Sequence, residues 1–165
     1  MDLEYDYRKQ ARMKTIVVSA SKSSHQNTRR IAEIFGDTLN ARVISPEMAT
    51  PAVLAQADRI GFGSGVYWMN FDPQLVECIR KLPDMSGRVA FVFATSGLPE
   101  LPFRRYTHRL GLQLEERGFR VIGSFSCRGV DTWGPFGMIG GVSKGRPNQH
   151  DLTRAKRCAE QIAVH

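Results

Sequence analysis

Residues 14–39 constrain the fold more than any other part of this chain. They begin with a short apolar run, residues 15–19, whose β-branched side chains predict a buried strand. A hydroxyl-rich stretch follows, and the chain then places Ile31, Phe35 and Leu39 on one side of a predicted amphipathic helix. A strand, a polar loop and a helix in this order predict an α/β protein.

The polar stretch at residues 21–28 has the chemistry of an anion site. Its serine hydroxyls, together with Asn27 and Thr28, can donate hydrogen bonds to phosphate oxygens. The free backbone N–H groups at a helix start point in the same direction. Asn27 or Thr28 is also predicted to cap the helix. We therefore expect this loop to seat a phosphate group.

Two arginines stand in the first turn of the same predicted helix. The helix dipole disfavours cations at this end, by about 0.3–1 kcal/mol each. A bound anion would reverse this cost for Arg29 and Arg30. The alternative, favoured for the arginines taken alone, is that both face solvent, with Glu33 compensating Arg29 four residues away.

Nucleotide-binding motifs of two common types are missing from the sequence. There is no GxxxxGK[ST] stretch, so a nucleoside triphosphate loop is not predicted. No GxGxxG follows the first strand, and the glycines at 61, 63 and 65 give only a weak dinucleotide signal. Four histidines without ligand spacing do not predict a metal site.

Length and composition limit the number of domains, the presence of membrane spans and the state of the cysteines. A chain of 165 residues suits one domain, predicted at 14–165, with residues 1–13 as an N-terminal extension. No long apolar run predicts a membrane span, and the polar residues 1–13 do not resemble a signal peptide. Three widely spaced cysteines without a CxxC suit packed thiols in the cytoplasm, with a small reservation for Cys127.

The net charge of +7 attracts acidic partners, nucleic acid or anionic membranes. The basic residues are spread along the chain, however, and no nucleic-acid motif is present, so nucleic-acid binding is not favoured.

Strands and helices are predicted to alternate along the chain. Strands are predicted at residues 15–19, 42–45, 58–64, 88–94 and 119–125, with helices around Leu75–Leu82, Phe103–Leu114 and Leu152–Ile162 and a short turn or helix between Pro46 and Pro51. This alternation predicts a three-layer α/β/α sandwich around a five-stranded parallel sheet. Ligands bind such sheets at the carboxyl ends of the strands.

Three later loops should meet the first one at that edge. The loop at 64–71 carries Gly65, Tyr67 and Trp68, whose aromatic rings suit either a flat ligand or ordinary packing. The loop at 95–99 offers Thr95 and backbone donors, and the long glycine-rich loop at 126–147 is of a length that is often functional.

With these loops in this order, the chain resembles the flavodoxin family over residues 14–163. The resemblance rests on the Asn27-Thr28 loop, on residues 60–67 and 93–97, and on the stretch from Gly123 to Pro135. It implies the strand order 2-1-3-4-5 with FMN at the switch point. Family phosphate loops usually carry glycine before Asn-Thr, where this chain has Gln26 and one extra residue.

The resemblance also implies which residues hold FMN. Residues 21–28 would bind the phosphate, 64–68 would border the isoalloxazine with Tyr67 or Trp68 stacked on it, and 95–97 would bind its pyrimidine edge. The full set is Ser21, Lys22, Ser23, Ser24, His25, Gln26, Asn27, Thr28, Ser64, Gly65, Val66, Tyr67, Trp68, Thr95, Ser96 and Gly97.

The sequence is compatible with three functions. The first is an FMN-binding electron carrier with redox partner proteins, which the basic charge predicts to be acidic. The second is an FMN-dependent NAD(P)H:quinone or small-acceptor oxidoreductase, for which Arg104 or Arg105 offers one phosphate contact. The third is a binding module that has the fold without the flavin.

Overall fold

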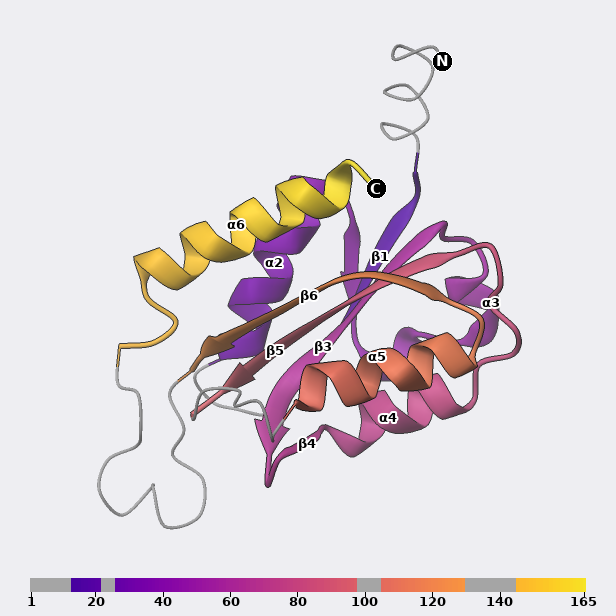
Figure 1. The fold of residues 1–165 in the computed structure, drawn as a ribbon, viewed down its shortest axis with the longest axis horizontal. Helices are drawn as coiled ribbons and strands as arrows, with labels where there is room; N and C mark the ends of the chain where they lie inside the picture. The colour runs from indigo at the N-terminus through magenta and orange to yellow at the C-terminus, as the bar shows by residue number, and fades with distance from the viewer. Residues whose placement is uncertain (1–12, 22–25, 98–104, 130–144) are drawn as a thin grey trace.

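A parallel β-sheet covered by helices on both faces forms this protein (Figure 1). The computed structural model describes residues 13–21, 26–97, 105–129 and 145–165. The long strands lie in the order β2-β1-β3-β5-β6. Their bounds are β1 Thr15–Ala20, β2 Arg42–Ile44, β3 Arg59–Tyr67, β5 Val89–Ser96 and β6 Arg120–Arg128.

The predicted three-layer sandwich and the order of its five parallel strands are confirmed, with one difference. A sixth strand, β4 at Asn70–Phe71, pairs antiparallel with the end of β3. It is only two residues long and carries no alternating apolar pattern, so periodicity could not reveal it.

Two pairs of long helices cover the sheet. Helices α2 (Asn27–Leu39) and α6 (Gln149–Ala163) pack together on one face, and α4 (Pro73–Arg80) and α5 (Tyr106–Glu116) cover the other (Figure 1). The short helix η1 (Pro46–Met48) lies in the predicted turn between the two prolines, and a second short helix, α3 (Pro51–Leu54), begins at Pro51.

The glycines of β3 have a packing role. A Cβ on Gly61 would come within 2.3 Å of the Phe91 ring, and one on Gly63 within 2.2 Å of the Phe93 ring. Both rings lie beside Phe35 of α2, at centroid distances of 5.0 and 5.4 Å. These glycines therefore admit aromatic side chains between sheet and helix, which accounts for the weak dinucleotide signal in the sequence.

Three strands extend beyond their predicted ends. The sequence predicts that strands end at Ser64, Ala94 and Phe125, but β3, β5 and β6 continue to Tyr67, Ser96 and Arg128. The ladders run on through polar residues, pairing Gly65 with Thr95 and Thr95 with Cys127. Several of the residues predicted to lie in loops therefore belong to the hydrogen-bonded ends of strands.

Among the described residues, no helix combines the length and the apolar character needed to cross a membrane. The predicted extension at residues 1–13 lies outside the described residues except for Met13.

Candidate functional site

The start of α2 is fastened to the end of β5 by a hydrogen bond between two hydroxyls. Thr28 Oγ1 and Thr95 Oγ1 lie 2.8 Å apart, and both residues are buried. The residues are 67 positions apart in the sequence. This contact brings the end of the first predicted loop against the end of β5, as expected if the loops meet at one edge of the sheet.

Asn27 lies against the end of β6. A Cβ on Gly129 would stand 2.6 Å from Asn27 Nδ2, so only glycine fits there without a shift. The Gly129 N–H donates to the Ser96 carbonyl over 2.9 Å. The segments after β1 and β6 therefore meet the end of β5 at the carboxyl edge of the sheet. Gly129 was missed as a site residue, because its approach to Asn27 is visible only in three dimensions.

Gln26, and not Asn27 or Thr28, is the N-cap of α2. Asn27 and Thr28 are the first residues of the helix, so the predicted cap is wrong. Gln26 has φ 49° and ψ 35°, a left-handed conformation, and its side chain caps no backbone N–H. Such a conformation costs a non-glycine residue about 1–2 kcal/mol. This backbone geometry explains why glycine suits the equivalent position in the phosphate loops that the sequence resembles.

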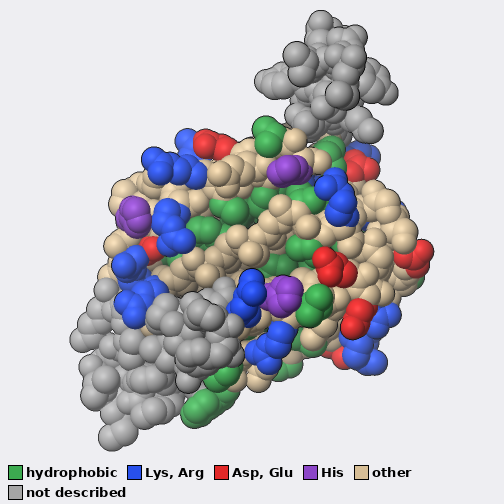
Figure 2. Space-filling view, in the orientation of Figure 1, with side chains coloured by type: hydrophobic (Ala, Val, Ile, Leu, Met, Phe, Trp, Pro, Cys, Tyr) green, Lys and Arg blue, Asp and Glu red, His purple; other side chains and the backbone are tan. Residues whose placement is uncertain are grey.

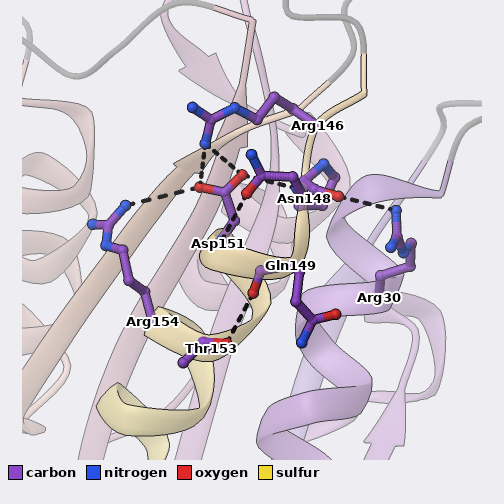
Figure 3. Close-up of polar contacts among 8 residues, drawn as sticks. Arg30, Arg146, Asn148, Gln149, Asp151, Thr153 and Arg154 are labelled. Carbon is purple, nitrogen blue, oxygen red and sulfur yellow. Dashed lines mark hydrogen bonds and ion pairs between the residues drawn. The ribbon is translucent and has the colours of Figure 1, made fainter.

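The two arginines of the first turn are both engaged. Arg29 pairs with Glu33 over 3.0 Å on the exposed surface, as the solvent-facing interpretation predicts. Arg30 donates from Nη1 to the Pro147 carbonyl at 3.3 Å and so ties α2 to the segment before α6 (Figure 3). This contact was not foreseen, because nothing in the local sequence pairs residues that far apart.

A buried carboxylate organises that segment (Figure 3). Asp151 is 1% exposed and receives Arg146 Nη1 at 2.6 and 2.7 Å on its two oxygens. It also accepts the Asn148 N–H, while the Asn148 side chain accepts the Asp151 N–H, which completes a capping box. Burial alone would raise the pKa of Asp151, but the hydrogen bonds and the charges of Arg146 and Arg154 hold this pKa below its usual value.

The end of β3 also lies at the carboxyl edge of the sheet, next to β5. The Tyr67 hydroxyl lies over Gly65, because a Cβ on Gly65 would be 2.8 Å from it. Ser64 Oγ donates to the Gly65 carbonyl and accepts the Asp72 N–H. The hydrogen bonds of the Ser64 hydroxyl therefore join the two ends of the tight hairpin between β3 and β4.

The two residues at the tip of this hairpin have unusual backbones. Trp68 and Met69 have φ values of 48° and 63°, where glycine or asparagine is usual. Trp68 is 71% exposed, so packing in the core is excluded for this ring. Arg109 of α5 donates to the Met69 carbonyl over 2.7 Å and holds the tip in place. Strained, exposed aromatic residues of this kind occur at functional sites.

Cys127 belongs to β6 and not to a loop, and its side chain is buried. Burial, and then the nearby Asp151 carboxylate, raise the pKa of Cys127 to about 12. Cys78, Cys127 and Cys158 are all free thiols. Among the described residues, no cluster of three or more His, Cys, Asp or Glu side chains is placed to hold a metal ion.

The described residues suit a flat, phosphorylated ligand. The first turn of α2 carries no acidic residue, and the missing side chains of Gly65 and Gly129 let Tyr67 and Asn27 lie close against the backbone at the edge. Ser19 Oγ, near the end of β1, is buried and has no hydrogen-bond partner among the described residues. Ser21 is exposed, Val66 packs against the core and Gly97 is buried at the end of β5. The predicted site residues Lys22, Ser23, Ser24 and His25 lie outside the described residues.

The architecture makes this a flavodoxin-like α/β protein. Its fold matches a flavodoxin from the domain Archaea, with TM-score 0.61, 22% identity, and 92% and 96% of the two chains covered. It also matches oxidised Flavodoxin 2 from Bacillus cereus, with TM-score 0.67, 17% identity, and coverage of 92% and 97%. A further match is the Trp repressor binding protein from Bacillus subtilis, with TM-score 0.68, 19% identity, and coverage of 88% and 98%. At these identities the likeness concerns the fold alone.

A sequence relative defines the family more closely. The uncharacterized protein MJ0298 of Methanocaldococcus jannaschii is 33% identical over 150 residues, which are 91% of this chain and 98% of the relative. The chain belongs to the same family as MJ0298. No protein-family model matches it.

Proposed function

We propose that this protein binds FMN at the carboxyl edge of its sheet and transfers electrons through the flavin. The observation that carries the proposal is the buried bond between Thr28 and Thr95. It sets the start of α2, with its backbone N–H groups, beside the polar end of β5. The flavodoxin-like fold supports the same position, because ligands of such sheets bind where the strand order reverses.

The chain's own residues divide the binding between them. The hydroxyls and backbone N–H groups of residues 21–28 would hold the phosphate at the start of α2. Thr95, Ser96 and Gly97 would face the pyrimidine edge, and Ser64–Trp68 would border the ring system. Trp68 is exposed at the hairpin tip and Tyr67 lies over Gly65, so either ring can cover a flat ligand after a small movement.

The protein's task is to bind and orient the cofactor and to set its electrostatic surroundings. When bound, FMN supplies the redox chemistry, which no side chain of the described site can perform. The raised pKa of Cys127 keeps this thiol protonated and outside that chemistry. The three free thiols suit a reducing compartment, and we place the protein in the cytoplasm.

Two measurements test this function. The visible absorption spectrum, taken before and after adding FMN, should show a bound flavin, whereas a colourless protein that takes up no FMN would indicate a binding module without cofactor. Purified protein should then fail to oxidise NADPH with menadione as acceptor. Steady turnover of NADPH by the protein alone would identify a reductase in place of a carrier.

A further inference from the structure

The hairpin tip between β3 and β4 and the first half of α5 form one exposed surface. We call it the turn–α5 surface; it consists of Trp68, Met69, Arg105, His108, Arg109 and Leu112. Two contacts join its halves. Arg109 donates to the Met69 carbonyl over 2.7 Å, and Phe71 of β4 meets Tyr106 of α5 edge-to-face at 6.1 Å.

Charge is arranged along α5 against the helix dipole. Arg105 stands at the N-cap, no acidic residue occupies the first turn, and Glu115 and Glu116 end the helix, so that only Arg117 at the C-cap is placed in favour of the dipole. Each unfavourable placement costs up to about 1 kcal/mol of helix stability. Figure 2 shows basic side chains over the start of this helix and acidic ones towards its end. The arrangement is therefore not explained by stability, and it concentrates positive charge at the hairpin tip.

The same surface exposes large apolar side chains beside those charges. Trp68, Met69 and Leu112 are 71%, 43% and 46% exposed. Figure 2 shows hydrophobic side chains at the lower edge of the molecule, near β4. Tryptophan and arginine are the residues that most often dominate binding energy in protein interfaces. An apolar tip beside cations suits a partner protein better than a bare phosphate backbone.

We propose that the turn–α5 surface docks an acidic protein. Carboxylates of the partner meet Arg105 and Arg109, and an apolar patch of the partner covers Trp68 and Met69. A second copy of this chain is a poor occupant, because two chains of net charge +7 repel each other. The proposal rests on the proposed function, since the partner is the donor or acceptor of the flavin's electrons.

The test measures binding of FMN-loaded protein to an acidic plant-type [2Fe–2S] ferredoxin at low salt, followed by NMR of the labelled protein. Flavin loading is checked first by absorption, so a failure of the proposed function is seen separately. Perturbed amides should map to the hairpin tip and to the first half of α5. Arg105→Glu should weaken binding about tenfold or more. The milder Arg105→Gln should weaken it in the same direction.

Arg120→Glu is the matched control. Arg120 is exposed at the start of β6, near the opposite end of α5, and the charge change is identical. Equal loss in both variants, absence of ferredoxin binding, or perturbed amides on another face would overturn the proposal. Tighter binding of a single-stranded oligonucleotide or of phosphatidylserine vesicles than of ferredoxin would overturn it as well.

Discussion

At the scale of single residues, the candidate site depends on a few side chains that the sequence identifies but whose contacts only the structure shows. The Asn27-Thr28 pair was expected near the phosphate, and the structure adds that Thr28 bonds Thr95 and that Asn27 meets Gly129. These contacts join residues far apart in the chain, so no local pattern contains them. The departure at Gln26 carries a backbone cost, because this residue adopts the left-handed conformation that glycine would adopt freely.

Gln26→Gly should stabilise the protein relative to Gln26→Ala. Glycine avoids the cost of about 1–2 kcal/mol that the left-handed conformation imposes on alanine. Against this, the greater conformational entropy of glycine in the unfolded chain destabilises the folded state by about 0.4–1 kcal/mol. We therefore expect glycine to exceed alanine by up to about 1.5 kcal/mol in the free energy of unfolding, measured with urea. Equal stability of the two variants would show that this position is not strained.

The Thr28–Thr95 bond can be measured with a double-mutant cycle. Thr28→Val leaves the buried Thr95 hydroxyl unsatisfied and should cost about 1–3 kcal/mol of unfolding free energy. Thr95→Val should cost a similar amount. The double variant should cost less than the sum of both, because neither hydroxyl is then left alone. Additive losses would mean that the bond does not couple α2 to β5.

At the scale of elements, the sequence predicted most of what the structure contains. Helix α2 was placed by its apolar stripe, and the long strands were found by their β-branched runs. The strand ends were predicted too short, because pairing to a neighbour extends β3 and β5 through polar residues. The sequence did not predict the two-residue β4 or the hydrogen bond from Arg30 to the Pro147 carbonyl, because both depend on tertiary contacts.

The start of α6 should respond to acid. The folded-state pKa of Asp151 is lowered, so its stabilising effect is complete above the unfolded pKa of about 3.9 and is lost as pH falls through the folded value. Asp151→Asn should cost about 1–3 kcal/mol of unfolding free energy at pH 7. The difference from wild type should shrink only below about pH 4.

The exposed ion pair between Arg29 and Glu33 provides the control for the Asp151→Asn measurement. Glu33→Gln removes the exposed partner of Arg29 and should cost no more than about 0.5 kcal/mol. A stability gap between Asp151→Asn and wild type that stays constant down to pH 2 would contradict the role assigned to the Asp151 carboxylate.

At the scale of the whole molecule, fold and charge together set the expected redox behaviour. The chain is basic, and Arg105 is exposed at the N-cap of α5, one turn before Arg109, which holds the hairpin tip proposed to border the flavin. Positive charge stabilises the anionic reduced flavin, so we expect a less negative reduction potential than in an acidic protein of the same fold. Arg105→Gln should lower the potential by on the order of 10 mV, because one charge near solvent contributes well below 1 kcal/mol.

The reduction potential is measured by redox titration of the FMN-loaded protein. Arg120→Gln, which changes the same charge near the far end of α5, should leave the potential nearly unchanged. Equal shifts in both variants, or a higher potential in Arg105→Gln, would show that the turn–α5 surface does not act on the flavin.

The central claim is that the loop between β1 and α2 seats the phosphate of a flavin. A fluorescence titration with FMN and, in parallel, with riboflavin tests it most directly, because the two ligands differ by that phosphate. We predict binding of one FMN per chain with a Kd of about 1 μM or tighter, and binding of riboflavin weaker by about a hundredfold. Equal affinities for FMN and riboflavin, or no binding of either, would contradict this account.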